Sequence, residues 1–592
     1  MYILGISCYF HDAAAALLED GVLVAAAEEE RFTRKKHDYE FPQNAINFCL
    51  EQAKITGKDL DYVVFFEKPF VKFDRLLKTS LQGFPRTYPL FVQSMRTWLF
   101  DKLWIKSLIT KSVGVESQRV LFSEHHLSHA ASAFFCSPFD DAAVLTFDGV
   151  GEWATTTMGT GRGNDLQITH EQCFPHSLGL LYSAFTAFLG FEVNEGEYKV
   201  MGMAPYGSPK YVEEVRKVIK QNDDGSFWLD PRYFSFHYST RNSFTRKMVD
   251  IFGEPRKPET PFFTETSGYP SYFGPRPHNF NELSRYNEHY ADIAASIQVV
   301  TEDLILSLVR ELHRQTGSHR LCLAGGVALN SVANGRILRE TPFEELYVQP
   351  SAGDGGGALG AALVAWHCAL GESNRRFVMD HAYWGEEFTP DEARSAIEAS
   401  GLKGQWVDNE SELLDQTVDR LMSGKVIGWH QGRFEWGPRS LGNRSILADP
   451  RLSQMKDTVN TKIKFREPFR PFAPSVEVSS AGRYFNIPDP ETSFPARFML
   501  LVVPVNEGQD QVIPAVSHVG TARLQTVHPD SNPRYHALIT SFGEASGVPV
   551  LLNTSFNIRG EPVVNTPQDA INTFENSGID TLVMGNFIVD KP

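Results

Sequence analysis

A pattern of strand, small polar loop and returning strand occurs twice in the chain and restricts its fold more than any other feature. The first copy has strands expected at Tyr2–Cys8 and Val22–Ala27, with an Asp-Gly turn before the second. The second copy has strands expected at Ala142–Phe147 and Trp153–Met158, and an Asp-Gly pair joins them. Asp-Gly between apolar runs is typical of a β-hairpin. The sequence therefore predicts two related α/β halves in its N-terminal part.

Two glycine-rich loops also follow strands. One contains Gly325, Gly326 and Asn330, and the other is the run Gly353–Gly357 after the expected strand Leu346–Val348. Glycines allow backbone N–H groups to approach a phosphate or a ribose without a Cβ clash. A single Gly pair is typical of a tight turn, but several at strand ends favour a nucleotide cleft. The duplication fits an actin-like fold, whose two halves close over a nucleotide.

The segment after Ser123 carries two histidines four residues apart. Ser123 is a good N-cap, small and aromatic residues continue to Phe135, and Pro138 follows, so the sequence predicts a short buried helix. His125 and His129 would leave one face of this helix. Two neutral imidazoles so placed can hold one metal ion at ~2.0–2.2 Å. An isolated pair with this spacing is also typical of structural histidines, and both interpretations remain open from the spacing.

The charge balance limits the expected partners. The chain has 56 Lys and Arg against 72 Asp and Glu, a net charge of −16, so we expect no general nucleic-acid binding. Its six cysteines form no C-x-x-C pair, which suits a cytoplasmic protein without a disulfide framework. We expect no signal peptide. Charged residues interrupt the apolar stretch from Pro89 to Val113, which predicts an amphipathic helix and no membrane span.

The length of 592 residues is too great for one hydrophobic core, so we expect two large domains. We place the first at residues 1–372 and the second at residues 381–592, with the polar run Ser373–Arg376 in the link. The stretch 253–285 is rich in Pro, Thr and aromatic residues and has little periodicity. It predicts an insertion or a mobile lid.

The second domain contains a basic concentration that is unusual in so acidic a chain. Arginines stand among glycines, prolines and aromatic residues in Gly432–Ser445 and again in Lys464–Phe472. Guanidinium groups in rigid turns suit phosphate or carboxylate oxygens, whereas a solvated face would show lysines at helical spacing. Arg523 and the run Asn553–Asn557 offer further donors. We expect an anion pocket here rather than a surface patch.

Nine short motifs occur in an order typical of one known family. They are Phe10–Ala13, Glu28–His37, His125–Ala130, Asp148-Gly149, Tyr198–Gly202, Ala324–Val327, Gly437–Arg439, Arg470–Ser475 and Asn553–Asn557. Over nearly its whole length the chain resembles the O-carbamoyltransferases that modify antibiotics, nodulation factors and related natural products. Each motif alone is weak, but together and in order they are specific.

The resemblance implies a fold and a reaction. The fold would be α/β, with an N-terminal actin-like domain of the ASKHA class, similar to tRNA threonylcarbamoyltransferases, and a C-terminal YrdC-like domain. The C-terminal domain would make carbamoyl-adenylate from carbamoyl phosphate and ATP. The N-terminal domain would transfer the carbamoyl group to the hydroxyl of a small-molecule acceptor, such as a sugar, a polyketide or an alkaloid alcohol.

The resemblance also implies roles for individual residues. The family's metal ligands, which suit Fe²⁺ or another divalent first-row ion, correspond to His125, His129, Asp148 and Asp354. The nucleotide-binding loops of the N-terminal domain contain Lys199, Gly325, Gly326 and Asn330. The residues expected to bind carbamoyl phosphate and Mg²⁺-ATP in the C-terminal domain are Arg439, Lys464, Arg470, Arg523, Asn553 and Ser555.

His11 corresponds to the family histidine that faces the acceptor, which makes it the candidate general base for the hydroxyl. From the residues alone, a strand-end histidine bonded to Asp12 is an equal interpretation. Tyr9 stands where an aminosugar-modifying member of the family has an aspartate. The resemblance therefore implies the reaction but does not name the acceptor.

Three other functions are compatible with parts of the pattern. A HypF-like enzyme that carbamoylates a protein cysteine should carry paired C-x-x-C motifs, and this sequence has none. A tRNA threonylcarbamoyl enzyme is disfavoured by the acidic balance. An actin-like nucleotide switch without turnover leaves the arginine cluster without a role. The sequence leaves open whether two copies of the chain form a homodimer.

Overall fold

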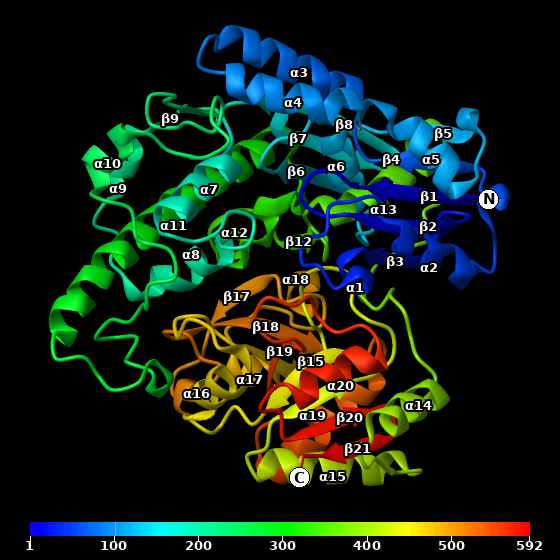
Figure 1. Cartoon of the computed structure of the whole chain (residues 1–592), viewed down its shortest axis with the longest axis vertical. Coiled ribbons are helices and arrows are strands. Elements are labelled where there is room, and N and C mark those ends of the chain that lie inside the picture. Colours follow the sequence, from blue (N-terminus) through cyan, green and yellow to red (C-terminus); the bar gives the residue numbers. More distant parts are fainter. Residues whose placement is uncertain (101, 592) are drawn as a thin grey trace. The chain divides into compact units, whose positions relative to one another are not determined.

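The computed structural model describes residues 1–100 and 102–591, which form a mixed α/β protein (Figure 1). The chain divides into two compact units. The first unit contains Met1–Glu29, Asp38–Gly268 and His278–Met379. The second contains Glu30–His37, Tyr269–Pro277 and the residues from Asp380 onward. Two short segments of the N-terminal part thus belong to the second unit, and one of them lies within the stretch expected as a lid.

The first unit contains a five-stranded sheet in the order β3-β2-β1-β4-β5. Its strands are β1 (Tyr2–Ser7), β2 (Ala14–Glu19), β3 (Val22–Glu28), β4 (Tyr62–Phe65) and β5 (Val120–Phe122). The first three strands are antiparallel neighbours, while β4 runs parallel to β1, and β5 parallel to β4. Their alanines, valines and leucines are almost all buried, as expected for strands covered on both faces.

A second sheet of the same unit repeats this arrangement, in the order β8-β7-β6-β11-β12. Its strands are β6 (Asp141–Phe147), β7 (Ala154–Arg162), β8 (Asp165–Cys173), β11 (Arg320–Ala324) and β12 (Glu345–Val348). Again three antiparallel strands are followed by two parallel ones. The predicted duplication is confirmed by the equal strand order.

Two helices in equivalent places of the two halves pack against each other. Helix α6 (His125–Phe134) follows β5, and helix α13 (Asp354–Leu363) follows β12. Helix α13 packs on the first sheet and α6 on the second. A Cβ atom on Gly360 would lie 1.8 Å from the carbonyl oxygen of Ser128, so only glycine permits this approach of α13 to α6. The closeness of the helices brings their N-terminal ends together.

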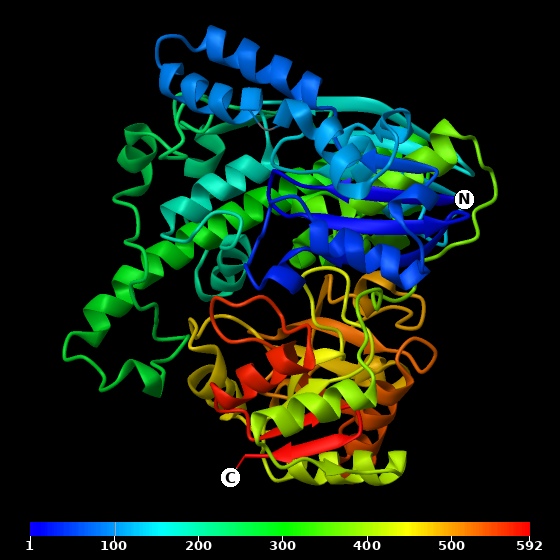
Figure 2. The ribbon, with the colours of Figure 1, turned by 45° about the vertical axis from the view of Figure 1, so that its right-hand side comes forward.

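The remaining helices of the first unit surround the two sheets. They are α2 (Gln43–Ala53), α3 (Pro69–Gln82), α4 (Tyr88–Phe100), α5 (Ile105–Val113), α7 (Leu178–Phe188), α8 (Glu197–Met203), α9 (Val212–Lys217), α10 (Arg246–Phe252), α11 (Phe280–Thr316) and α12 (Ser331–Glu340). A small ribbon pairs β9 (Ile219–Gln221) with β10 (Phe227–Leu229). Figure 2 shows the long helix α11 extending through this unit.

Two local predictions were wrong. The single amphipathic helix expected between Pro89 and Val113 is two helices, α4 and α5, with the 3₁₀ turn Lys102–Trp104 before α5. Ser123 is not the N-cap of α6, because its hydroxyl donates to the carbonyl of Glu124 (3.3 Å) and the helix begins at His125. Within residues 1–100 and 102–591, no helix is long and apolar enough to cross a membrane.

The second unit is built on a nine-stranded mixed sheet in the order β13-β21-β20-β14-β15-β19-β16-β18-β17. Its strands are β13 (Gln405–Trp406), β14 (Ile427–His430), β15 (Arg444–Ala448), β16 (Ala473–Glu477), β17 (Leu501–Pro504), β18 (Thr521–Val527), β19 (Val550–Ser555), β20 (Thr581–Met584) and β21 (Phe587–Asp590). Its helices are α1 (Glu30–Thr33), α14 (Pro390–Ser400), α15 (Glu410–Met422), α16 (Met455–Val459), α17 (Ala481–Tyr484), α18 (Phe494–Arg497), α19 (Pro533–Ser546) and α20 (Pro567–Glu575).

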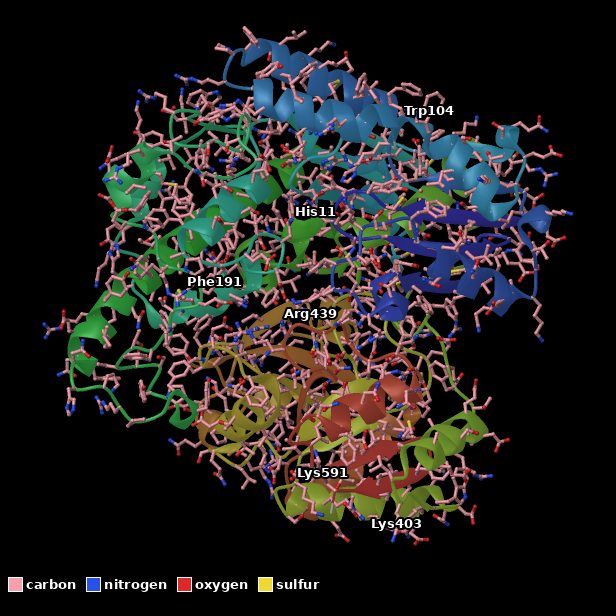
Figure 3. The ribbon with its side chains drawn as sticks, viewed as in Figure 1. His11, Trp104, Phe191, Lys403, Arg439 and Lys591 are labelled. Atoms are coloured by element: carbon pink, nitrogen blue, oxygen red, sulfur yellow. The ribbon has the colours of Figure 1, made fainter. Side chains whose placement is uncertain are left out.

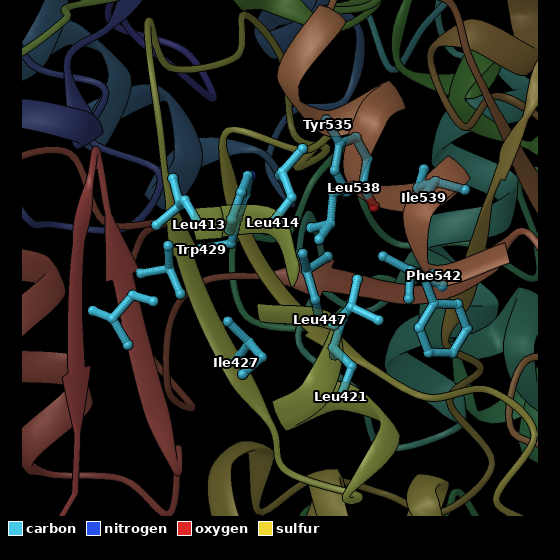
Figure 4. Close-up of a cluster of buried hydrophobic side chains, with 14 of the residues drawn as sticks. Leu413, Leu414, Leu421, Ile427, Trp429, Leu447, Tyr535, Leu538, Ile539 and Phe542 are labelled. Carbon is cyan, nitrogen blue, oxygen red and sulfur yellow. The ribbon is translucent and has the colours of Figure 1, made fainter. Parts of the chain in front are cut away.

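Helices α15 and α19 cover an apolar cluster on this sheet. Trp429, Leu447 and Leu551 of the strands are fully buried against Leu413 of α15 and Tyr535 of α19 (Figure 4). Successive side chains of a strand alternate between its faces. The residues two and four positions beyond Leu551 therefore continue the same face, and there the apolar cluster gives way to polar side chains.

Candidate functional site

Four predicted metal ligands come together where strands end in the first unit. His125 and His129 leave one face of α6, Asp148 follows β6, and Asp354 is the first residue of α13. One ligand atom from each of the four residues lies within 4.8 Å of the other three. Because α6 and α13 occupy equivalent places in the two halves, the duplication places these residues together. All four are buried.

The distances fit one shared ion. His125 Nε2 lies 3.2 Å from His129 Nε2, 3.1 Å from Asp148 Oδ2 and 3.7 Å from Asp354 Oδ1. His129 Nε2 lies 3.7 Å from Asp148 Oδ2 and 3.8 Å from Asp354 Oδ1. Neighbouring ligands at ~2.1 Å from a metal are about 3.0 Å apart in an octahedron and about 3.4 Å apart in a tetrahedron. The four residues therefore fit a small divalent cation.

The polar atoms around this centre also fit a cation. Asp354 Oδ1 is buried and has no hydrogen-bond partner among the described residues. Burial, with the negative charge of Asp148, raises the pKa of Asp354 well above its usual value. Burial alone would raise the pKa of Asp148 as well, but the imidazoles of His125 and His129 hold this pKa well below its usual value. A cation between the two carboxylates would satisfy both.

Backbone groups orient the two carboxylates. The N–H of Gly326 donates to Asp148 Oδ1 (3.1 Å), and the N–H of His11 donates to Asp354 Oδ2 (3.3 Å). The loop with Gly326 and the loop with His11 therefore both reach this centre. Burial lowers the pKa of His11, so its ring is held toward the neutral form.

The neighbouring His126 has a structural role. Its Nδ1 lies 2.6 Å from Thr146 Oγ1, and its Nε2 lies 2.9 Å from the carbonyl oxygen of Ala154. Both ring nitrogens are thus used inside the fold. The spacing of histidines along α6 does not separate a ligand from a structural residue, but these contacts do.

A buried ion pair beside the centre was missed from the sequence. Glu67 and Lys72 are each 3% exposed, and their charged atoms lie 2.5 Å apart. Glu67 Oε2 is 3.9 Å from His125 Nδ1, which has no hydrogen-bond partner among the described residues. The ammonium of Lys72 lies 3.9 Å from the ring of Phe10, which packs on His11 at 4.1 Å. Neither residue lies in a recognisable motif, so only the fold could identify them.

The residues expected to bind a nucleotide in the first unit have different local surroundings. Gly325 has φ +92°, and a Cβ on it would lie 2.2 Å from the carbonyl oxygen of Phe147, so this loop requires glycine. Asn330 caps α12 and accepts from the N–H of Ala333 (3.2 Å). Lys199 lies on α8 with its ammonium 5.7 Å from the ring of Phe191. Gly325 and Gly326 thus adjoin the metal ligands, while the Asn330 side chain is engaged in a helix cap.

In the second unit, Lys464 is held by the loop that follows β19. Its ammonium donates to the carbonyl of Ser555 (2.5 Å), the carbonyl of Asn557 (2.9 Å) and the Asn557 side-chain oxygen (2.8 Å). Burial, with the nearby charges of Arg466 and Arg470, lowers the pKa of Lys464 well below its usual value. The structure thus joins two of the predicted residues, Lys464 and Ser555, directly.

Asn553 connects three strands and the loop of Arg439. Its amide nitrogen donates to Ser475 Oγ (3.0 Å), to Gln525 Oε1 (3.0 Å) and to the carbonyl of Ser440 (3.2 Å). Its own amide oxygen is buried and has no hydrogen-bond partner among the described residues. Arg523 lies two residues before Gln525 and so on the same face of β18. Three of the predicted anion-binding residues, Arg523, Asn553 and Ser555, therefore lie on this polar half of the sheet face.

Not every arginine of the basic run is available to a ligand. Arg444 is fully buried and donates to the carbonyls of Gln431 (2.5 Å) and Gly432 (3.0 Å). Arg433 donates to the carbonyl of Gly385 (2.8 Å). These two arginines hold loops in place, so the anion pocket expected from this run stays a prediction that depends on its other basic residues.

A carboxylate that sequence reasoning missed shapes the loop of Arg439. Glu435 is buried, and its Oε1 accepts the backbone N–H groups of Leu441 (2.8 Å), Asn443 (2.9 Å) and Arg444 (3.1 Å). Gathering three N–H groups on one oxygen fixes the loop between Glu435 and Arg444. Arg439 lies within this loop, so Glu435 holds its backbone in a rigid turn.

These features define the class: an α/β protein with a duplicated unit that holds a two-histidine, two-carboxylate centre, and a second unit with a basic, polar sheet face. The chain belongs to the carbamoyltransferase family. The family's N-terminal model, described as the carbamoyltransferase N-terminus, matches residues 2–363, and its carbamoyltransferase C-terminus model matches residues 418–591. The family resemblance drawn from the motifs is confirmed.

Several curated proteins are similar to this chain. Uncharacterized protein sll1178 of Synechocystis sp. is 46% identical over 100% of this chain and 97% of its own length. Nodulation protein NolNO of Sinorhizobium fredii is 36% identical over 98% of this chain and 79% of its own length. The 3'-hydroxymethylcephem-O-carbamoyltransferase of Amycolatopsis lactamdurans is 36% identical over 45% of this chain and 48% of its own length.

Among solved structures, HypF of T. kodakarensis is 14% identical and covers 63% of this chain and 49% of its own, with a TM-score of 0.31. A likeness of this size carries no argument about the site. The two sheets of the first unit repeat one strand order, while the actin-like assignment of this unit and the YrdC-like assignment of the second unit stay predictions.

Proposed function

We propose that the protein is an ATP-dependent O-carbamoyltransferase that uses carbamoyl phosphate and modifies a hydroxyl of a small-molecule acceptor. One observation carries this proposal: in a chain of the carbamoyltransferase family, four buried ligand atoms converge within 4.8 Å beside the backbone of His11. A nucleotide switch without turnover has no need of a second unit with a basic sheet face. The family and the relative named as an O-carbamoyltransferase support a transferase.

The second unit is the proposed place of activation. Carbamate is a poor electrophile, because its carbonyl is resonance-stabilised and anionic. Water first cleaves carbamoyl phosphate to carbamate and inorganic phosphate. A carbamate oxygen then bonds to the α-phosphorus of ATP, the bond from that phosphorus to pyrophosphate breaks, and the product is a mixed anhydride with a good leaving group. Two anions must meet for this reaction, and the cationic groups of Arg439, Arg470 and Arg523 would offset their repulsion. Lys464 would hold the loop that carries Ser555.

Asn553 could position the carbamoyl group during the formation of carbamoyl-adenylate. Its amide nitrogen is already used within the sheet, so its unpartnered oxygen is the group that remains for a ligand N–H. The carbamoyl NH₂ group is such a donor. Ser555 is held beside Lys464 by Asn557, whose side-chain oxygen accepts from its hydroxyl (2.7 Å).

The first unit is the proposed place of transfer. The acceptor oxygen forms a bond to the carbamoyl carbon, the bond from that carbon to the AMP oxygen breaks, and the hydroxyl proton passes to the His11 imidazole. His125, His129, Asp148 and Asp354 would hold Fe²⁺ or another divalent ion. A bound ion of this kind supplies Lewis-acid stabilisation of the phosphate leaving group.

The test separates activation from transfer. Purified protein is incubated with Mg²⁺, ATP and carbamoyl phosphate without any alcohol, and pyrophosphate release is measured. A carbamoyl-adenylate former releases pyrophosphate that depends on carbamoyl phosphate. A nucleotide switch releases none, and this result would overturn the proposal. A panel of sugar, polyketide and alkaloid alcohols then identifies the acceptor by mass spectrometry of the carbamoylated product.

A further inference from the structure

The insertion between β4 and β5 contains a helix that buries two cationic side chains and exposes large apolar ones. On α3 the buried positions include Lys72, Arg75 and Ser80, whereas Phe70 and Leu81 are each 73% exposed. An ordinary surface helix buries its apolar face and exposes its charges. Helix α3 departs from this pattern in part, because its buried cations have partners within the unit while Phe70 and Leu81 stay exposed. The ion pair of Asp74 and Lys78 is exposed beside them, and Phe73 packs on Trp98 of α4 at 5.9 Å.

The inner face of this insertion contacts the loop that leads to His11. Lys72 pairs with Glu67 and lies over the ring of Phe10, and Lys102 donates to the backbone carbonyl of Tyr9. Arg75 donates to the carbonyl of Gly151 (3.2 Å). These contacts explain how Lys72 and Arg75 of α3 are held inside the unit, since buried charges need charged or carbonyl partners.

The outer face of the insertion extends over α3, the turn after it, α4 and the turn before α5, and it exposes many large apolar side chains. Figure 1 and Figure 2 both show α3 and α4 side by side at one edge of the first unit, and Figure 3 labels Trp104 near them. The exposed large apolar residues of this outer face are Phe70, Val71, Leu81, Phe84, Tyr88, Val92, Leu99 and Trp104.

The area of the outer face is that of a protein interface. Four of its residues are aromatic and are 59–73% exposed. At ~200 Å² for each aromatic side chain, these four leave roughly 500 Å² uncovered, and the aliphatic residues bring the total to roughly 800–1,000 Å². A standard stable interface buries about 800 Å² from each partner. The exposed Asp74 and Lys78 lie among these apolar side chains on α3, as charged groups do in ordinary protein interfaces.

The charge of the insertion selects among possible occupants. Residues 68–111 contain nine Lys and Arg against two Asp, a net of +7 in a chain of net −16. An anionic membrane surface would attract the insertion but repel the rest of the chain. A second copy needs no charge complement, because apolar and aromatic area of this size suffices for a symmetric contact. The exposed cations Arg86, Arg96, Lys106 and Lys111 would then meet their counterparts across the contact.

We propose that the outer face of this insertion binds the same face of a second copy of the chain, giving a symmetric dimer. This inference is independent of the proposed reaction. Because like charges face each other in such a contact, salt should tighten the dimer by screening them. Binding to an anionic lipid surface would respond in the opposite way, because salt weakens it.

The test is sedimentation equilibrium of the full chain at about 50 mM and about 500 mM NaCl, since screening differs strongly between these conditions. We expect a dimer that is tighter at the higher salt concentration. Leu81→Glu should raise its dissociation constant at least ~10-fold, because a charge would be buried in the contact. Phe70→Ser should act in the same direction without introducing a charge. Val519→Glu, at an apolar position 61% exposed in the second unit, should leave the dimer unchanged.

Circular dichroism of each variant verifies folding, and vesicles of phosphatidylcholine with about 30% phosphatidylglycerol test the membrane alternative by flotation. A wild-type chain that stays monomeric overturns the proposal. So does a dimer that survives both Leu81→Glu and Phe70→Ser, or one that Val519→Glu dissociates. Salt-sensitive vesicle binding that Leu81→Glu abolishes would assign the face to a membrane instead.

Discussion

The Nε2 atoms of His125 and His129 lie 3.2 Å apart and face Asp148 and Asp354 from one side of α6. Side chains four residues apart on a helix meet in this way when both are turned to the same target. The two carboxylates come from segments that are 206 residues apart along the chain, at positions 148 and 354. The centre is therefore a product of the duplicated fold and not of one motif.

His125→Ala should remove the bound metal. Losing a direct ligand should lower the affinity by more than the ~10–100-fold that outer contacts contribute. Metal content after dialysis is measured by elemental analysis, with His126→Gln as the matched control, because the ring of His126 bonds to Thr146 and Ala154 instead. We expect pyrophosphate release to persist in His125→Ala. Undiminished metal would exclude His125 from the ligand set.

Glu67→Gln should weaken metal binding by ~10-fold, as changes in outer contacts commonly do. Glu67 is the acidic group that faces His125 Nδ1, and its charge is balanced by Lys72. Affinity is measured by competition with a chelator, which does not depend on turnover. Glu51→Gln, on the exposed face of α2, is the control. An affinity equal to that of the wild type would limit Glu67 to pairing with Lys72.

Arg439→Ala should reduce carbamoyl-phosphate-dependent pyrophosphate release by at least ~100-fold, because removing one group that stabilises developing charge typically costs that much. The metal content of the first unit should not change. Arg394→Ala, at a half-exposed arginine of α14, serves as the control. Normal pyrophosphate release by Arg439→Ala would remove this residue from the activation site.

The stability of the protein should rise as the pH increases from about 8 toward 10.5. Burial lowers the pKa of Lys102 from 10.5 to about 8 in the folded chain. Between these values the unfolded chain binds more protons than the folded chain, so unfolding becomes less favourable as the pH increases. Thermal melts across this range should show a flatter profile in Lys102→Met than in the wild type. An unchanged slope would show that Lys102 does not contribute.

The candidate site could be predicted in part from local patterns. The two strand–loop–strand copies predicted the duplication, and the i, i+4 histidines predicted a common face, because both depend on short-range periodicity. The motif resemblance then added Asp148 and Asp354. Glu67 could not be found, because its role depends on a buried position next to His125 and not on any spacing along the chain.

The basic run of the second unit shows what residue composition alone does not predict. Its composition predicted one anion pocket, yet Arg444 and Arg433 bind backbone carbonyls, while Glu435 holds the turn that presents Arg439. A guanidinium group can donate to a carbonyl oxygen as well as to a phosphate oxygen, so residue type alone cannot decide between the two. Only burial and nearby carbonyl groups separate a structural arginine from one that is available to a ligand.

The sequence by itself determined the duplicated strand pattern, the family and the residue types that can hold a cation or an anion, since these depend on side-chain chemistry and on spacing along the chain. The tertiary structure alone decided which polar groups are satisfied inside the fold and which face a site, and it placed Lys72 and Arg75 of α3 inward. Burial and partnership arise when segments that are distant in the chain pack together, and no local pattern of residues contains that information.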